Sequence, residues 1–313
     1  MSQTLEALSR QKDSLESIHG IVHTMKTLSV INAAPYEQAA RAIEAYHGVI
    51  LDGLHAFLSA ARLVESTEAA AGLRVLVVFG SDHGLCGNYN ERTASHVAEH
   101  LSAAGRGETA ILCVGAQMVD ALGDRSLGVT STFLPAASAE GVGRLANNLT
   151  RCLDEMQKDA GGRGIAVDLA WMARDEAGYA PRIAPLLPLD PVLVGDLRRR
   201  PWKSRSLPSY AMPSTDLFRA LLRAHVFASL VRAAAEAMVS ENAARLALMQ
   251  QAEQSVEDRL DGLNTEANAL RQSGITTELL DVIVGFEAMK RARERRQPGA
   301  RSHPASQARG HED

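Results

Sequence analysis

The feature that most constrains the fold is a long stretch without proline near the C-terminal end. No proline occurs from Ser214 to Arg296, and Ser214 or Thr215 gives a plausible helix N-cap before Asp216. At about 1.5 Å per residue, a helix over 215–289 would be about 110 Å long, which far exceeds the diameter of a small domain. We therefore predict a single very long C-terminal helix.

Both ends of the chain carry the spacing of a coiled-coil seam, with apolar residues at alternating intervals of three and four or at intervals of seven. Two such seams predict one antiparallel pair of helices. Pro35 lies inside the N-terminal segment, and a proline inside a helix costs roughly 3 kcal/mol, so we expect a kink or a break near it. The seam residues are Leu8, Leu15, Ile18, Val22 and Met25, and then Val256, Leu260, Leu263, Ala267, Leu270 and Gly274.

The middle of the chain alternates between strand-like and helix-like segments. Leu73–Phe79 is a short β-branched run, and the glycine-rich turn Gly80–Gly87, a helical stretch and a second apolar run at Ala110–Val114 follow it. Further strands are predicted near 129–134, 165–171 and 181–187, with a helix over 138–158. This alternation predicts an α/β domain with a Rossmann-like, mostly parallel sheet, flanked by the N- and C-terminal helices of a long antiparallel coiled coil.

These patterns divide the chain into five parts. We predict an N-terminal coiled-coil helix over 1–66, an α/β domain over 67–197, a linker rich in proline and arginine over 198–213, a C-terminal coiled-coil helix over 214–289, and a basic disordered tail over 290–313.

Composition excludes several classes of function. A formal net charge of −4 and a pI near 6.2 argue against bulk binding to nucleic acid or anionic lipid. Three widely spaced cysteines do not indicate a disulfide framework or a zinc site. The first ten residues lack a signal pattern, and no run reaches about 18 apolar residues, so any work at a membrane would depend on partners.

The end of the C-terminal helix is apolar on all sides, which predicts burial on all sides. The N-terminal segment can cover one side only. A membrane span is excluded by the shortness of the run and by Glu278 and Asp281, so we expect a surrounding sleeve of protein. The apolar residues are Ile275, Leu279, Leu280, Val282, Ile283, Val284 and Phe286.

The Gly80–Gly87 turn lies where α/β folds often bind phosphate, between a strand and a helix. It matches neither G-x-x-x-x-G-K-[ST] nor G-x-G-x-x-G. Asp82, His83 and Cys86 are imaginable metal ligands, and Cys86 a nucleophile, but no second cluster or base accompanies them. A turn with satisfied polar side chains and a small buried thiol is the favoured interpretation.

Three segments in this order resemble the gamma subunit of F-type ATP synthases. They are Ser81–Gly87 (Ser-Asp-His-Gly-Leu-Cys-Gly), Ser240–Arg245 (Ser-Glu-Asn-Ala-Ala-Arg) and Arg271–Leu279 (Arg-Gln-Ser-Gly-Ile-Thr-Thr-Glu-Leu), and the resemblance covers about residues 3 to 289. It implies a rotor shaft inside a hexamer of alpha and beta subunits. The α/β domain would then sit beside the epsilon subunit and on the membrane c-ring, so that proton or sodium flow turns the shaft.

The resemblance also implies roles for particular residues. Ser81, Asp82, Gly84, Leu85, Cys86 and Gly87 would form the motif turn of the α/β domain, and Thr24, Lys26, Arg271, Gln272, Thr276, Glu278 and Ile283 would contact the hexamer. By default the polar members of the second set are a solvated helix face. None would be catalytic, and no cofactor or metal is expected. The implied location is the cytoplasmic face of a bacterial cell membrane, as a peripheral protein.

The sequence departs from the family in several places. Thr27–Tyr36 replaces a strongly basic stretch, His83 stands where arginine is usual, Asn88 and Tyr89 replace a Gly-Leu pair, and the basic tail extends past the usual end. A divergent branch, such as an alternative or sodium-coupled synthase, is our hypothesis. Two other functions stay open at this point: a nucleotide-dependent enzyme with its site at the Gly80–Gly87 turn, and a free-standing coiled-coil adaptor.

Overall fold

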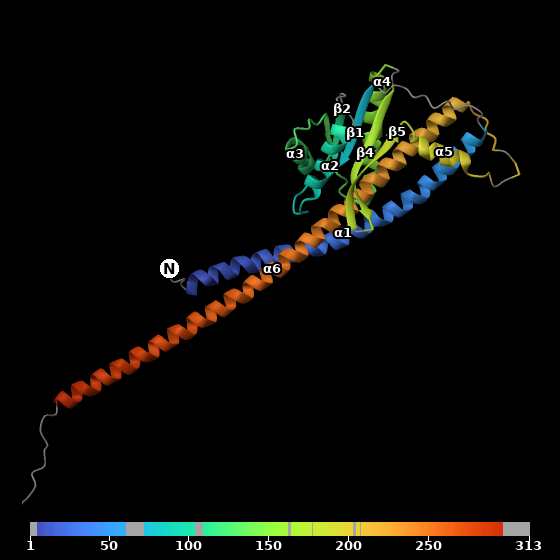
Figure 1. Cartoon of the computed structure of the whole chain (residues 1–313). Helices are drawn as coiled ribbons and strands as arrows, with labels where there is room; N and C mark the ends of the chain where they lie inside the picture. The colour runs from blue at the N-terminus through green and yellow to red at the C-terminus, as the bar shows by residue number, and fades with distance from the viewer. Residues whose placement is uncertain are drawn as a thin grey trace, which may run out of the picture. The chain divides into compact units, whose positions relative to one another are not determined.

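The computed structural model describes residues 5–60, 72–103, 109–161, 164–176, 178–202, 205–206 and 208–296. The predicted boundary at residue 66 and most of the predicted tail therefore lie outside the described residues. The chain forms two compact units, residues 1–20 with 254–313 and residues 21–253. The elements, in chain order, are α1 (Leu5–Ala60), β1 (Leu73–Phe79), α2 (Tyr89–Ala103), β2 (Thr109–Val114), α3 (Ala116–Gly123), β3 (Ser131–Phe133), α4 (Ala139–Asp159), β4 (Ile165–Asp175), β5 (Gly178–Leu187), α5 (Pro191–Arg199) and α6 (Ser214–Arg296) (Figure 1).

The second unit contains a sheet of five strands in the order β3-β2-β1-β4-β5. β1 pairs in parallel with β2 and with β4, and β2 pairs in parallel with β3. Only β5 is antiparallel, because the short connection from Asp175 to Gly178 cannot make the long crossover that parallel strands need. The predicted fold class, a mostly parallel sheet flanked by long terminal helices, is confirmed.

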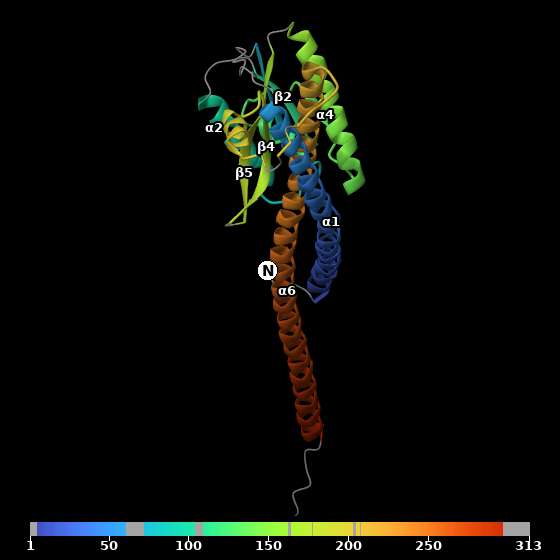
Figure 2. The ribbon, with the colours of Figure 1, turned by 90° about the vertical axis from the view of Figure 1, so that its right-hand side faces the viewer.

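Helices cover both faces of this sheet. α4 and part of α6 pack on one face of the sheet (Figure 2). Leu149 and Leu230 from these helices meet Val77 and Trp171 in the main core. α2 and α3 pack on the other face around Leu76, Val78 and Met118. Burial on both faces explains why Val75–Phe79 in β1 is a continuous apolar run without alternation.

α1 is one continuous helix, and the break expected at Pro35 is absent. Pro35 is exposed, so water can solvate the carbonyl group that loses its helical partner. The next residue, Tyr36, is buried in the main core, and its hydroxyl donates to Ala136 O at 2.9 Å. Packing of this side chain offsets the cost of the proline, which propensity alone did not reveal.

A period of seven residues organises the inner face of α1, and every member of two series is buried or half-buried. The predicted seam position Ile18 is exposed, whereas its neighbour His19 is half-buried. Polar members of the series were missed because the prediction followed apolar residues only. The series are Leu8, Leu15, Val22, Ser29, Tyr36, Ile43, Ile50 and Phe57, and Lys12, His19, Lys26, Ala33, Ala40, His47 and Leu54.

α6 runs for 83 residues, from Ser214 to Arg296, slightly past the predicted end. Five predicted seam residues, from Val256 to Leu270, are buried or half-buried, but Gly274 is exposed.

Ahead of α6, the short helix α5 was not predicted. Asp190 caps it by accepting from Val192 N at 2.8 Å, and Pro191 occupies its first turn, so the Asp-Pro pair is the signal that could have found it.

Candidate functional site

The turn after β1 is closed by its own side chains. Ser81 N donates to Asn90 Oδ1 at 3.0 Å, Asn90 Nδ2 donates back to Ser81 Oγ at 2.8 Å, and Ser81 Oγ lies 3.5 Å from Cys86 Sγ. Leu85 and Gly87 both have φ of 63°, the left-handed region. Ser81, Cys86 and Asn90 therefore satisfy one another within the turn, which fits the interpretation of a turn with satisfied polar side chains.

Close backbone packing holds the same turn against the start of α3. Asp82 Oδ1 accepts from Ala116 N at 3.2 Å, and Ser81 O accepts from Gln117 N at 3.1 Å. A Cβ at Gly115, whose φ is 101°, would come within 2.5 Å of Ser81 O, so this approach requires glycine. Asp82 thus caps a helix, and the side chain of His83 is 86% exposed, which separates it from the buried thiol of Cys86.

The second motif of the sequence lies directly against this turn. Ser240 Oγ donates to Met172 O at 2.9 Å, and the Tyr89 hydroxyl donates to Ala237 O at 3.1 Å. Arg245 Nη2 lies 2.7 Å from Glu241 Oε1 and 3.5 Å from the carbonyl oxygens of both His83 and Gly84. We call residues 81–90 together with 237–245 the motif junction. It joins two segments about 150 positions apart in the sequence and attaches the α/β domain to α6.

Burial dominates the electrostatics of the motif junction. Glu241 is 5% exposed, and burial raises the pKa of its carboxyl, while the hydrogen bond from Arg245 acts in the opposite direction. Burial also raises the pKa of the Cys86 thiol and of the Tyr89 hydroxyl. A protonated, buried thiol is a poor nucleophile, because the thiolate is the reactive form. The junction has the chemistry of a structural joint.

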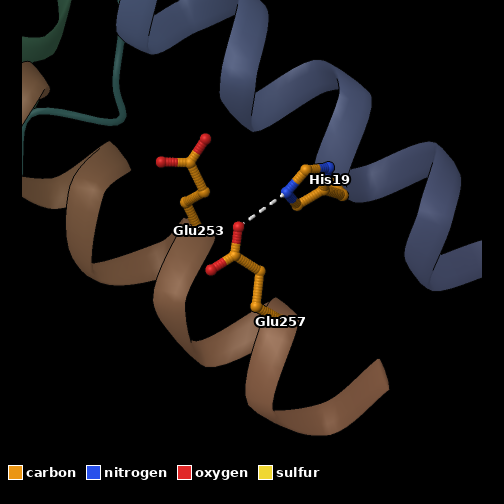
Figure 3. Close-up of side chains that lie close together, drawn as sticks. All are labelled: His19, Glu253 and Glu257. Atoms are coloured by element: carbon orange, nitrogen blue, oxygen red, sulfur yellow. Dashed lines mark hydrogen bonds and ion pairs between the residues drawn. The ribbon is translucent and has the colours of Figure 1, made fainter. Parts of the chain in front are cut away.

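Lys26 lies inside the pairing of α1 with α6. Its Nζ donates to Glu253 Oε2, and His23 Nδ1 lies 3.0 Å from Glu253 Oε1. The hydrogen bond from Lys26, followed by that from His23, lowers the pKa of Glu253. The other polar residue predicted on α1, Thr24, is exposed. The first unit contains a similar pair, in which His19 Nε2 lies 3.3 Å from Glu257 Oε1 (Figure 3).

The remaining predicted contact residues lie on the bare end of α6, our name for residues 271–293, all of which are exposed. Thr276 Oγ1 donates to the carbonyl of Gln272 at 2.9 Å, and so it serves the helix itself. Large apolar side chains here are 52% to 68% exposed. They are Ile275, Leu279, Leu280, Val282, Ile283, Val284, Phe286 and Met289, and among them stand the predicted Arg271, Gln272 and Glu278.

The structure therefore brings two of the three sequence motifs together, and the third, Arg271–Leu279, belongs to the other unit. Sequence reasoning did not assign a role to Asn90, Glu241 or Arg245. The spacing of Glu241 and Arg245, four apart on a helix, was a usable signal of an ion pair. Within the described residues, no helix is long and apolar enough to cross a membrane.

Comparisons with known proteins agree with this architecture. A family model described as ATP synthase matches residues 4–289. The ATP synthase gamma chain of Mycolicibacterium vanbaalenii is 28% identical over 316 residues, covering 94% of this chain and all of that one. The gamma chain of Alkaliphilus metalliredigens is 23% identical and covers 89% of this chain and 97% of that one.

A solved structure shares the fold as well. A chain from the Euglena gracilis mitochondrial ATP synthase, in a structure of OSCP, F1 and c-ring, matches with a TM-score of 0.60 and 17% identity, covering 96% of this chain and 99% of that one. Because the family model spans residues 4–289, the chain belongs to the ATP synthase family, in which the relatives that it matches are gamma chains.

Proposed function

We propose that the chain is the central shaft of a rotary ATP synthase and couples ion movement through a membrane c-ring to ATP synthesis or hydrolysis in an alpha and beta hexamer. The bare end of α6 carries this proposal. Eight large apolar side chains between Ile275 and Met289 are more than half exposed, on a helix that continues to Arg296. Contiguous exposed apolar surface of this kind marks an interaction site.

A protein sleeve fits this surface better than lipid does. Glu278, Asp281 and Glu287 interrupt the apolar run, and ionised side chains are costly inside a bilayer. A ring of partner subunits could cover all sides of the helix and leave its polar groups hydrogen-bonded. Gln272, Thr276, Glu278 and Ile283 are the proposed contacts at this end, with Arg271 at its base and with Thr24 and Lys26 on α1.

The motif junction supports a mechanical role for the α/β domain. A rotor must transmit torque from the part that contacts the c-ring to the part inside the hexamer. Arg245, Ser240 and Tyr89 make hydrogen bonds across that connection. We propose that the domain contacts the c-ring and the epsilon subunit, and that the junction prevents it from slipping on α6 as torque is applied.

The proposed shaft is not itself catalytic. Asp82 caps α3, Cys86 is a buried thiol and Oε1 of Glu241 is paired with Arg245, so these three groups already have a structural use. Catalysis would reside in the partner subunits, and an asymmetric shaft would bias their conformations through differential contact energy. The proposed location is the cytoplasmic face of a bacterial cell membrane, as a peripheral subunit.

Co-purification tests the proposal. A tagged chain, extracted gently from its native membrane, should bring alpha-like, beta-like, epsilon-like and c-like subunits with it. The competing enzyme hypothesis makes the opposite forecast. If the chain alone bound a nucleotide with micromolar affinity, lost it on Gly84→Val and came without those partners, the shaft proposal would be wrong. Gly84→Val is a fair probe because a Cβ at Gly84 meets nothing within 4 Å.

A further inference from the structure

A charged cleft of about 330 Å³ lies between α1, the ends of β4 and β5, and α6, within the second unit. Four arginines line it: Arg41 from α1, Arg174 from β4, Arg182 from β5 and Arg232 from α6. None of them belongs to the motif junction or to the bare end of α6. The cleft therefore has no role in the function proposed above.

The glutamates of the cleft are already engaged, at least in part, by groups of the same chain. Glu236 Oε2 accepts from Trp171 Nε1 at 2.7 Å, and its Oε1 lies 3.9 Å from Arg232 Nε. Glu37 lies 3.7 Å from Arg41, and Glu44 is the third acid in the lining. Four arginines against three glutamates leave a formal surplus of one positive charge.

The donors, in contrast, are incompletely used. Arg232 Nε is buried and has no hydrogen-bond partner within the described part of the chain. The backbones of Arg174 and Arg182 belong to the β4–β5 pairing, but their guanidinium groups form no hydrogen bond or ion pair with any other described residue. The guanidinium carbon of Arg182 lies 5.6 Å from the centre of the Trp171 ring, and this stacking limits the orientations that its N–H groups can adopt.

We propose that this cleft binds a tetrahedral oxyanion of the phosphate class. The guanidinium groups of Arg174, Arg182 and Arg232 come from three elements and can donate to several oxygens of one phosphate. A carboxylate offers only two oxygens. Tyr179, which also lines the cleft, adds a neutral hydroxyl donor. The proposed site is independent of the shaft proposal, because it needs no partner subunit and uses arginines that the shaft proposal does not involve.

Titration of the full-length chain with inorganic phosphate tests the proposal. Phosphorus NMR at constant ionic strength, held with sodium acetate, should show saturable binding with Kd of about 1 mM or below. The double variant Arg174→Gln with Arg182→Gln should weaken binding by about tenfold or more. Both arginines are exposed, so the variant should keep its melting temperature, which circular dichroism would check.

A matched control removes the same charge elsewhere. Arg151→Gln with Lys158→Gln, both exposed on α4, should leave phosphate binding unchanged. The proposal would be overturned if the arginine variant and the control variant bound phosphate with the same Kd. Absence of saturation below about 20 mM phosphate with the wild-type chain would also overturn it.

Parallel titrations would identify the source of the phosphate group. ATP and vesicles of phosphatidylglycerol, compared with phosphatidylcholine vesicles, would be tested on the same three proteins. Binding of ATP that is tighter than that of inorganic phosphate, and that is lost in the arginine variant, supports the site and identifies a nucleotide as its natural occupant. The same result with phosphatidylglycerol vesicles identifies a lipid headgroup. Failure of all these probes would leave the co-purification result for the shaft unaffected.

Discussion

Two neighbouring stretches of α6 in the first unit carry similar aliphatic side chains and differ in how they are covered. In residues 256–270 the apolar residues follow one narrow stripe, and Leu263 is 8% exposed. In the bare end of α6 they occur on all sides, and Leu279 is 58% exposed. A narrow stripe can be buried by one partner helix, but an all-round apolar surface cannot. The first stretch should therefore contribute to the stability of the isolated chain, and the second to its assembly with partners.

The largest effect is expected from a charge placed on the bare end of α6. Ile283→Asp should leave the melting temperature of the isolated chain unchanged, because the side chain is exposed there. In the assembled complex the same change would bury an unpaired carboxylate at a cost of several kcal/mol. We therefore expect assembly or ATP-driven ion pumping by reconstituted vesicles to be lost.

The control is Ile283→Leu, which keeps volume and polarity and should pump normally. If Ile283→Asp also pumped ions at the wild-type rate, the bare end of α6 would not be a surface covered by partners.

In the part of α6 before its bare end, the largest effect is expected at the motif junction. Arg245→Ala would leave Glu241 buried without its partner and should lower the free energy of unfolding by about 3 kcal/mol at pH 7. Since protonation removes the unpaired charge, the penalty should shrink as the pH falls from 7 to 5. Urea denaturation at both pH values measures it, with exposed Arg259→Ala expected to change stability by less than about 0.5 kcal/mol.

Replacing a leucine by alanine should have different effects in the two stretches of α6. Leu263→Ala removes a buried side chain and should destabilise the local pairing of the helices by about 2.5 kcal/mol. Leu279→Ala should change it by less than about 0.5 kcal/mol. Amide hydrogen exchange of α6 in the isolated chain reports both. Equal effects would show that the isolated chain covers the bare end in solution.

Acid should weaken the pairing of α1 with α6 through two adjacent imidazoles, of which His225 is buried and His47 half-buried. His47 Nε2 lies 3.0 Å from His225 Nδ1, and burial, with smaller effects from His47 and Arg232, lowers the pKa of His225 to about 4. A depressed histidine pKa gives stability that is present above the unfolded pKa of about 6.5 and is lost as the pH falls towards 4. Going from pH 7 to pH 5 should therefore cost about 2 kcal/mol.

Urea denaturation at the two pH values measures that loss. His225→Gln can hydrogen-bond but not titrate, so it should flatten the pH dependence, whereas His96→Gln on α2 should leave it unchanged. If the wild-type chain and His225→Gln lost the same free energy of unfolding between pH 7 and pH 5, the role assigned to the pair would be contradicted.

How much of this could be read from the sequence depends on which physical signal was available. The sheet, the terminal helices and the seam from Val256 to Leu270 followed from periodicity, which reports burial directly. The bare end was recognised because its apolar residues leave no polar face. The continuous path of α1 through Pro35 could not be predicted, since it rests on the packing of Tyr36 against a segment about 100 residues away.

The motif junction shows a second limit. The sequence identified Ser81–Gly87 and Ser240–Arg245 separately, but nothing in either segment states that Arg245 reaches the carbonyls of His83 and Gly84. Contacts between distant segments depend on the tertiary fold, not on local spacing. The same applies to Lys26, which was predicted to face a partner and in the structure also donates to Glu253. Whether it contacts the hexamer as well stays a prediction.

The smallest expected effect concerns the polar pair beside the seam in the first unit. His19 Nε2 lies 3.3 Å from Glu257 Oε1, and about half of the Glu257 side chain, 52%, is exposed (Figure 3). Solvent screens such a pair, so His19→Gln should change the free energy of local unfolding by less than about 0.5 kcal/mol. Hydrogen exchange of residues 256–270 measures it against Leu263→Ala. If His19→Gln proved as damaging as Leu263→Ala, the polar members of the α1 series, rather than the aliphatic stripe, would hold this stretch of α6 in place.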